Sequence, residues 1–330
     1  MVITRTPFRI SFFGGGTDYP TWYVKHGGAV LSTTIDKYCY ITCRYFPPFF
    51  DASIRVVWSK IELANNVDEI EHPATKGVMK FFGMNNGLEV HHTADLPARS
   101  GLGASSSFTV GLMNAIHALR GEESAKEQLA RDAIHVEQEI IRENVGSQDQ
   151  IAAAMGGFNK IAFHNDGTFS VEPVGIKGDT LAALRDRLIL LFTGLSRNAS
   201  DIAAVQIRNT PQNERELTTM REMVDEGTAL LKKGDLDGFG SMLHEAWQLK
   251  RGLSHLISTR HIDDIYEAAR SEGALGGKLL GAGAGGFMLL YADPGLHARI
   301  KERLRDFLIV PFNFEPSGSQ VIYQSNGRLS

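Results

Sequence analysis

A glycine- and serine-rich segment at residues 97–108 separates a strand-like run from a helix-like pattern. The run at residues 88–96 has the β-branched content of a strand, and apolar residues recur at helical spacing from Phe108 to Leu119. Glycines let the backbone approach a ligand closely, and the free N–H groups of a helix's first turn attract phosphate. The pattern therefore favours one of two structures, an anion-binding loop or a glycine turn followed by a serine N-cap.

The spacing inside this segment differs from that of the two best-known phosphate loops. Gly-x-x-x-x-Gly-Lys-[Ser/Thr] needs a lysine just after its second glycine, whereas Ala104 follows Gly103 here. Gly-x-Gly-x-x-Gly needs a third glycine at the position of Ser106. Residues 97–106 instead resemble the Pro-x-x-x-Gly-Leu-Gly-[Ser/Ala]-Ser-Ser loop of the GHMP kinase superfamily.

That resemblance implies that the loop wraps the phosphates of ATP and lends a serine hydroxyl to Mg²⁺, so ATP and Mg²⁺ are the expected cofactors. Ser105, the second residue past Gly103, matches the family's metal-binding serine, and Ser106 is the alternative ligand. The nucleotide-binding residues that the resemblance implies are Pro97, Arg99, Ser100, Gly101, Leu102, Gly103, Ala104, Ser105 and Ser106.

A second glycine-rich loop lies near the N-terminus. Residues 3–13 have the pattern of an extended segment and lead into three consecutive glycines before Asp18, which alone would indicate a flexible turn capped by that aspartate. Residues 7–19, however, resemble the Pro-x-Arg-x-x-x-x-Gly-x-x-Thr-Asp-Tyr motif of galactokinases without a gap. The substrate-binding residues that this resemblance implies are Gly15, Gly16, Thr17 and Asp18.

Two glycines in this loop distinguish the chain from galactokinases, which carry Glu-His at the positions of Gly15 and Gly16. Removing two side chains makes room beside the sugar. The loop instead resembles the branch of the superfamily that contains heptose 7-phosphate kinases and fucokinase domains. This branch implies a longer or phosphorylated sugar rather than galactose.

A helical pattern after the phosphate loop places Glu137 at the edge of an apolar face and directs Glu139 away from it. A buried, unpaired carboxylate is costly, so Glu137 needs a partner, either a metal ion or a salt-bridging group near the surface. Residues 144–159 resemble a segment of galactokinases and heptose-phosphate kinases in which an aspartate follows a glutamate by twelve positions, as Asp149 follows Glu137. The resemblance implies that Glu137 binds Mg²⁺.

The same resemblance assigns catalysis to Asp149 and Arg9. Asp149 is expected to accept or orient the proton of the acceptor hydroxyl, and to contact the substrate. Arg9, which matches the arginine of the first motif, is expected to pair with Asp149 and keep it ionised.

A change of pattern at about residue 186 predicts a second domain. Residues 188–192 have the composition of a buried strand, residues 276–287 resemble the third GHMP motif, and Gly283 within them is a candidate substrate contact. The other expected elements are helices at 213–233, 235–251, 261–272 and 297–308 and a strand at 320–323. The three motifs together imply an α+β, two-domain GHMP kinase fold. Residues 1–185 would form a domain like ribosomal protein S5 domain 2, and residues 186–330 a ferredoxin-like domain, with the active site between them.

The predicted reaction is transfer of the ATP γ-phosphate to O1 of D-glycero-α-D-manno-heptose 7-phosphate, giving the 1,7-bisphosphate for GDP-heptose and cell-surface polysaccharide. Arg197, Lys37 and Arg44 are candidates to bind the substrate's own phosphate, unless they are ordinary solvated charges. The alternatives are a 1-kinase for an unphosphorylated sugar such as fucose and a non-catalytic sugar or nucleotide sensor of the same fold.

Composition excludes several classes of partner. The net charge is −4 and no basic stripe is present, so neither nucleic acid nor a membrane is expected to bind. Cys39 and Cys43 point to the same face of one predicted strand and are poorly placed to form a disulfide with each other. The N-terminus lacks the pattern of a signal peptide. We expect a cytoplasmic protein, monomeric or homodimeric, whose partners are ATP and a sugar phosphate.

Overall fold

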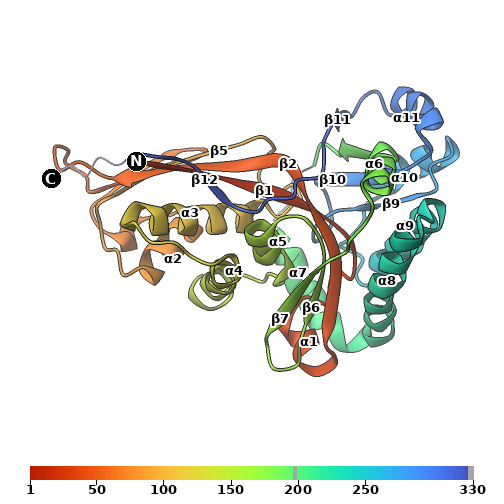
Figure 1. The fold of residues 1–330 in the computed structure, drawn as a ribbon, viewed down its shortest axis with the longest axis horizontal. Helices are drawn as coiled ribbons and strands as arrows, with labels where there is room; N and C mark the ends of the chain where they lie inside the picture. The colour runs from red at the N-terminus through yellow and green to blue at the C-terminus, as the bar shows by residue number, and fades with distance from the viewer. Residues whose placement is uncertain (196–198, 326–330) are drawn as a thin grey trace.

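Two β-sheets organise the chain in the computed structural model, which describes residues 1–195 and 199–325 (Figure 1). The first sheet has the strand order β12–β1–β2–β5–β3–β4, with β6 and β7 continuing from β2. Its pairs are antiparallel except that β3 runs parallel to β5. The strands are β1 (Val2–Phe13), β2 (Gly28–Tyr45), β3 (Ile54–Val57), β4 (Ile61–Ala64), β5 (Leu88–Ala94), β6 (Phe158–Phe163), β7 (Phe169–Pro173) and β12 (Gln320–Gln324).

The second sheet has four antiparallel strands in the order β11–β8–β10–β9. They are β8 (Leu188–Phe192), β9 (Gly276–Leu279), β10 (Phe287–Tyr291) and β11 (Leu308–Val310). All residues of β9 and β10 are buried, as the continuous apolar run of β10 predicts. The buried strand expected at residues 188–192 is present, and the α+β class is confirmed.

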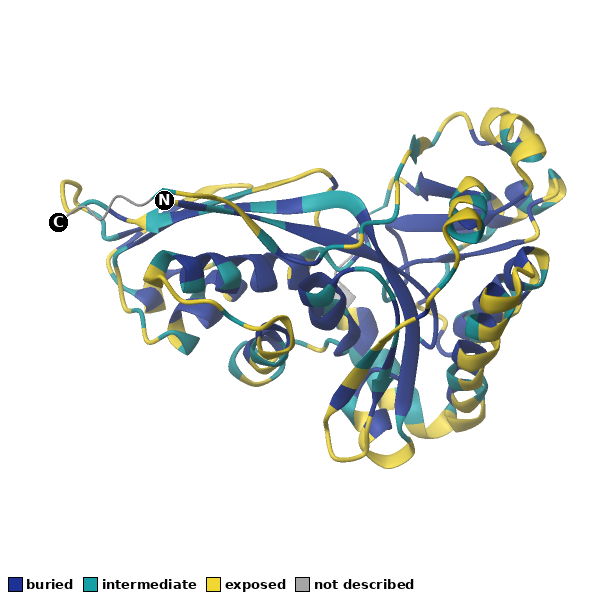
Figure 2. Ribbon diagram, viewed as in Figure 1, coloured by how far each residue is buried: buried dark blue, intermediate teal, exposed yellow. Residues whose placement is uncertain are grey.

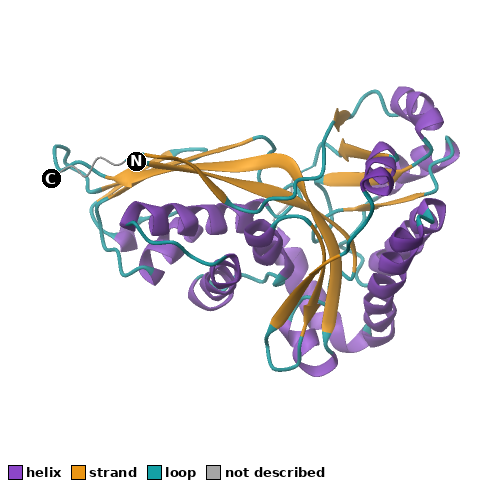
Figure 3. Ribbon diagram, in the orientation of Figure 1, coloured by secondary structure: helices purple, strands orange, loops and turns teal. Residues whose placement is uncertain are grey.

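Helices cover one face of the first sheet (Figure 3). The central one, α3, packs on β1 and β2, and it begins and ends at glycines in the left-handed region, Gly103 and Gly121. Helix α2 starts at a proline, which is favoured at the first helical position, with the His72 side chain as its cap. The helices are α1 (Pro20–His26), α2 (Pro73–Phe81), α3 (Ala104–Arg120), α4 (Lys126–His135) and α5 (Gln148–Met155), with the π-helical turn η2 (Val136–Ile140) extending α4.

Longer helices lie beside the second sheet and link it to the first. Helix α9 packs on β9, and α8 packs on both α9 and β2, so the two sheets share a helical layer. The long helices expected in this half are present, and the structure adds α7, which the sequence did not predict. The helices are α6 (Gly178–Asp186), α7 (Ala199–Asn209), α8 (Glu214–Lys233), α9 (Leu236–Gly252), α10 (Arg260–Ser271) and α11 (His297–Arg303). Throughout the described ranges, the helices fall short of the length and apolar character needed to cross a membrane.

The last strand, β12, corrects one expectation. We assigned it to the second half of the chain, but it pairs antiparallel with β1 at the edge of the first sheet. The residues before it follow the same sheet. Glu315 N donates to the Thr34 carbonyl oxygen, the Thr34 hydroxyl donates to the Glu315 carbonyl oxygen, and the Thr6 and Ser319 hydroxyls lie 2.8 Å apart. The apolar pattern of a strand identifies the strand but not its partner, which explains the error.

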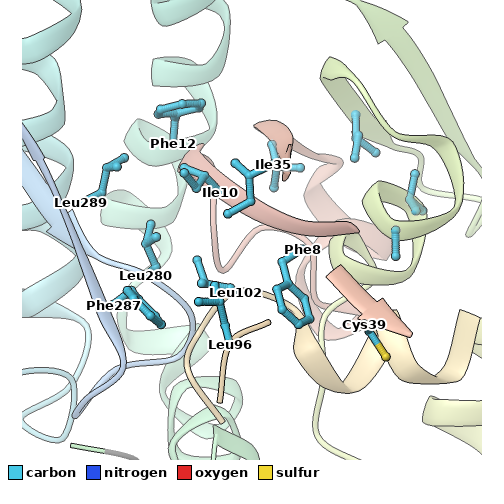
Figure 4. Close-up of a cluster of buried hydrophobic side chains, with 14 of the residues drawn as sticks. Phe8, Ile10, Phe12, Ile35, Cys39, Leu96, Leu102, Leu280, Phe287 and Leu289 are labelled. Atoms are coloured by element: carbon cyan, nitrogen blue, oxygen red, sulfur yellow. The ribbon is translucent and has the colours of Figure 1, made fainter. Parts of the chain in front are cut away.

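Apolar side chains from both halves meet beneath the phosphate loop (Figure 4). Leu102 of the loop is fully buried beside Phe8 and Ile10 of β1 and Leu280 and Phe287 of the second half. Figure 2 shows the facing surfaces of the sheets and helices as buried. Leu102 therefore anchors the phosphate loop in a core shared by the two halves.

Candidate active site

A cleft of about 820 Å³ lies between the two halves of the chain. Its walls come from the phosphate loop, the N-terminal glycine loop, the start of α5 and the buried ends of α9 and β9. The polar or charged residues that line it include Arg9, Ser11, Asp18, Ser100, Ser105, Ser106, Gln148, Asp149, Lys250 and Lys278. A cleft of this size, with few but convergent polar groups, is typical of a binding site for small molecules.

The phosphate loop takes the strained shape that its glycines allow. Gly101 and Gly103 have φ angles of 81° and 76°, and Gly103 leads directly into α3. The N–H groups of the first helical turn, from Ala104 to Ser106, have no acceptor within the helix and are available to an anion. All the residues that we expected to bind nucleotide line the cleft except Pro97 and Leu102. Leu102 points into the core, and Pro97 lines a separate, smaller cavity.

The second half of the chain packs directly against the phosphate loop. Phe287 N donates to the Ser100 carbonyl oxygen at 3.0 Å, and a Cβ at Gly101 would lie 2.4 Å from the Leu280 carbonyl oxygen. The third glycine-rich motif therefore supports the loop. Gly283 does not line the cleft as we expected, because it packs against the backbone of Ile257.

Glu137 is completely buried, whereas Glu139 is exposed, as the helical phase predicted. Of the two candidate serines, Ser106 contacts this carboxylate: its Oγ donates to Glu137 Oε2 at 2.9 Å, and Gln150 Nε2 donates to the same oxygen. Ser105 is exposed. The alternative ligand, Ser106, is thus the serine that lies beside the carboxylate.

The other oxygen of this carboxylate fits a cation. Glu137 Oε1 is buried and has no hydrogen-bond partner among the described residues, and burial raises the pKa of Glu137 to about 7. The described residues contain no group of three or more His, Cys, Asp or Glu side chains arranged to hold a metal. This matches Mg²⁺, which proteins usually hold through one or two carboxylates together with substrate phosphates and water.

Arg9 and Asp149 form a bidentate ion pair, as expected. Arg9 Nε lies 2.7 Å from Asp149 Oδ1 and Nη2 lies 2.9 Å from Oδ2, while Nη1 donates to the Gly101 carbonyl oxygen at 2.6 Å. The arginine is buried, and about a quarter of the Asp149 side chain is exposed to the cleft. A Cβ at Gly103 would lie 3.4 Å from Asp149 Oδ2, so the carboxylate adjoins the phosphate loop.

Asp18 is the second carboxylate of the cleft. Its oxygens accept hydrogen bonds from Gly16 N and Gln148 Nε2, each at 2.9 Å. Burial raises its pKa, and the nearby charge of Asp149 adds to that effect. Gly15 and Gly16 line the cleft beside it.

Thr17 does not reach the cleft. Its hydroxyl is buried against the Gly14 and Ala29 carbonyl oxygens, so it holds the glycine loop in place.

Two of the three cations proposed to bind a substrate phosphate, Lys37 and Arg44, do not line the cleft. Lys37 contacts Asp36 and lines the smaller cavity, and Arg44 pairs with Glu89. Arg197 lies outside the described residues.

Besides Arg9 and Arg99, the cleft is lined by two lysines, Lys250 and Lys278, which sequence reasoning missed. Lys250 follows the buried residue Trp247 by one helical turn, and this phase was the available signal. Four aromatic side chains from the first half of the chain also line the cleft, and sequence reasoning missed them as a group. They are Trp58, His72, His92 and Phe108.

Family comparisons agree with this geometry. Models of the N-terminal and C-terminal domains of GHMP kinases match residues 72–157 and 228–310. The D-glycero-alpha-D-manno-heptose 7-phosphate kinase of Campylobacter jejuni is 31% identical over 92% of this chain and 92% of its own length. The chain belongs to the GHMP kinase family.

Two further relatives of this GHMP kinase show the same fold and a second sugar class. A bifunctional fucokinase/GDP-fucose pyrophosphorylase of Arabidopsis thaliana is 25% identical over 91% of the chain, which matches 31% of that protein. The crystal structure of a D-glycero-D-manno-heptose 1-phosphate kinase from Bacteroides thetaiotaomicron aligns with a TM-score of 0.78 and 23% identity. It covers 99% of this chain and all of its own. This structure confirms the two-domain fold. The family models and the relative with 31% identity confirm the phosphotransferase class.

Proposed function

We propose that this GHMP kinase transfers the γ-phosphate of ATP to the anomeric O1 of D-glycero-α-D-manno-heptose 7-phosphate, giving the 1,7-bisphosphate. The observation that carries the proposal is the Arg9–Asp149 pair, which lies directly beside the phosphate loop. A hydroxyl that contacts Asp149 would face a phosphate held by the loop. The relative with 31% identity, whose name specifies a heptose 7-phosphate kinase, supports the choice of sugar.

Different residues of the cleft have different roles in phosphoryl transfer. The backbone N–H groups from Gly101 to Ser106 bind the nucleotide phosphates. Asp149 accepts the hydrogen bond of the acceptor hydroxyl, whose oxygen forms the new bond to phosphorus as the bond to the departing ADP oxygen breaks. Such reactions pass through a loose transition state, so positioning and charge neutralisation supply most of the catalysis. Arg9 fixes the carboxylate, because its two N–H groups hold both Asp149 oxygens.

Glu137 and Ser106 are the residues that would hold Mg²⁺. The buried oxygen of Glu137 without a partner and the adjoining Ser106 hydroxyl supply hard oxygen ligands. When bound, the metal would neutralise negative charge on the nucleotide phosphates. Because these oxygen ligands suit Mg²⁺, the metal is part of the proposed function.

The glycine loop supports a large acceptor. Beside a Cβ placed on Gly15 the nearest group is Gln148 Nε2 at 4.0 Å, so open space adjoins Asp18. Asp18 would accept hydrogen bonds from sugar hydroxyls.

We infer that the product feeds the synthesis of GDP-heptose for cell-surface polysaccharide.

A panel of acceptors tests the proposed substrate. We would compare kcat/KM for heptose 7-phosphate, unphosphorylated heptose, fucose and galactose, and we expect the phosphorylated sugar to be preferred. The fucokinase relative makes a fucose 1-kinase the second candidate, and preference for fucose would establish it instead. Binding of sugar or nucleotide without turnover of any acceptor would indicate a sensor.

A further inference from the structure

Two lysines in the cleft are buried without a direct ion pair among the described residues. The exposed fractions of Lys250 and Lys278 are 7% and 3%, and neither forms an ion pair with any carboxylate of the described residues. Moving an ammonium group out of water is expensive unless an anion or several hydrogen bonds compensate it. Neither lysine has a role in the mechanism proposed above. Their burial at the wall of a cleft therefore indicates that the cleft binds an anionic ligand.

The contacts of these ammonium groups leave donors free. Lys250 Nζ donates to the carbonyl oxygens of Leu279 and Gly281, and Lys278 Nζ donates to that of Phe12 at 2.8 Å. Each ammonium has three N–H groups, so one remains on Lys250 and two on Lys278 with no acceptor among the described residues. Within residues 1–195 and 199–325 no oxygen accepts from these donors, and they suit a ligand with several acceptor oxygens.

Two serine hydroxyl groups that line the same cleft also suit a ligand with several acceptor oxygens. Ser11 Oγ and Ser100 Oγ are buried and have no hydrogen-bond partner in the described part of the chain. Ser11 directly precedes Phe12, whose carbonyl oxygen holds Lys278. Buried hydroxyls are normally hydrogen-bonded, and unpaired ones beside a cavity are expected to bind what enters it.

Burial and nearby charges act on the pKa values of both lysines. Burial lowers the pKa of Lys250 to about 7 and that of Lys278 well below its usual range, the Arg9 charge lowers both further, and Asp18 opposes these effects. Arg9 is already paired with Asp149, so Asp18 is left to face two ammonium groups. An anion bound between them would restore the charged form of both lysines.

We propose that Lys250 and Lys278 bind the phosphate ester of a phosphorylated sugar acceptor. This inference rests on the proposed function and names the residues that would select its substrate. The nucleotide's γ-phosphate has the same chemistry, but the phosphate loop already offers it backbone N–H groups and Mg²⁺ ligands. The lysines instead share their electrostatic environment with Asp18, the carboxylate proposed for the sugar, and so favour the ester.

Lys278→Met gives the cleaner test, because Lys250 also supports the turn that packs on Gly101. We would measure kcat/KM of the wild type and the variant for heptose 7-phosphate and for unphosphorylated heptose, together with KM for ATP. We expect a loss of about tenfold to hundredfold for the phosphorylated sugar, the usual effect of removing a charged hydrogen bond, and little change for the other two values. Lys37→Met, at the lysine that lies outside the cleft, is the matched control and should leave all three unchanged.

The outcomes separate this inference from the proposed function. Equal losses for both sugars would mean that Lys278 acts on the transferred phosphoryl group or on structure, and would overturn the inference. A wild-type preference for heptose 7-phosphate that survives in Lys278→Met would do the same and leave the function intact. A wild type that prefers an unphosphorylated sugar would refute the proposed substrate and the ester site together. Lys278→Gln, which keeps a hydrogen-bond donor without the charge, provides the same comparison if the methionine variant does not fold.

Discussion

Arg9 holds Asp149 through both carboxylate oxygens and at the same time binds the Gly101 carbonyl oxygen of the phosphate loop. One buried side chain thus connects the group proposed to contact the acceptor hydroxyl with the loop proposed to hold the donor phosphates. Because arginine remains charged at any working pH, this arrangement fixes the carboxylate before substrates bind. Preorganised contacts of this kind are the main contribution a protein makes to phosphoryl transfer.

Asp149→Asn should abolish most of the activity without affecting nucleotide affinity. The change removes the ionised oxygen that faces the acceptor hydroxyl but leaves the backbone donors of the phosphate loop in place. We expect kcat to fall on the order of 10²-fold or more, with the ATP dissociation constant close to that of the wild type. Calorimetric titration with ATP and steady-state kinetics would measure both, and Asp306→Asn, at an exposed carboxylate, is the control. Wild-type turnover in Asp149→Asn would remove this residue from the mechanism.

A pair of neighbouring serines tests the proposed metal site. Ser106 lies beside Glu137 and Ser105 is exposed, so Ser106→Ala should raise the Mg²⁺ concentration for half-maximal activity about tenfold. Ser105→Ala should change it by less than about twofold. Rates measured across a Mg²⁺ series at fixed ATP give both values. If Ser105→Ala were the more harmful change, α3 would have to be rotated from its observed position or Ser105 would bind the metal directly.

The pKa of Glu137 predicts how the stability of the metal-free protein changes with pH. Burial raises this pKa to about 7, above the value of the unfolded chain near 4.3. The folded protein therefore binds more protons between these values, and the stability that Glu137 contributes is present at low pH and lost as the pH rises through about 7. Compared with Glu137→Gln, the wild type should lose on the order of 3 kcal/mol of unfolding free energy between pH 5 and pH 8.

Urea denaturation with a chelator at several pH values measures this difference. Glu139→Gln, at the exposed glutamate two residues away, should follow the wild type. Mg²⁺ should restore stability at pH 8 in the wild type and not in Glu137→Gln, because an ionised carboxylate is what the metal needs. Parallel pH profiles for the wild type and Glu137→Gln would show that this carboxylate is not held in the state described.

Sequence patterns predicted the parts of the site that depend on local structure. The change from alternating to helical spacing located the phosphate loop between β5 and α3, and helical phase separated Glu137 from Glu139. Which of Ser105 and Ser106 lies beside Glu137 could not be predicted, for a physical reason. Successive residues of a helix differ by about 100° in direction, so their orientation depends on how α3 is rotated against its neighbours. The first-turn motif contains no information about that rotation.

Tertiary contacts determined the rest and could not be predicted. Lys250 and Lys278 come from α9 and β9, which pack together in the second half of the chain. They line a cleft beside the phosphate loop only because that half folds against β1, where Lys278 donates to the Phe12 carbonyl oxygen. The same is true of β12, which has an ordinary strand pattern and pairs with the first strand of the chain. Charge and apolar patterns allow many pairings between segments that are distant in sequence. These patterns alone therefore do not identify which segments are in contact.

Gly101→Ala tests whether the second half of the chain supports the phosphate loop. The residue has a φ of 81°, and an added Cβ would lie 2.4 Å from the Leu280 carbonyl oxygen, so the loop would have to move away from that backbone. Gly121→Ala is a matched control because its φ is 75° and no atom lies within 4 Å of its Cβ position. Both changes incur the left-handed backbone penalty of roughly 1–2 kcal/mol, so the difference between them reports the contact itself. We expect Gly101→Ala to lower the unfolding free energy further than Gly121→Ala and to weaken ATP binding about tenfold or more, since the displaced backbone carries the N–H groups proposed to bind phosphate. Urea denaturation and calorimetric titration with ATP measure the two effects, and equal losses in the two variants would show that the Leu280 contact does not hold the loop.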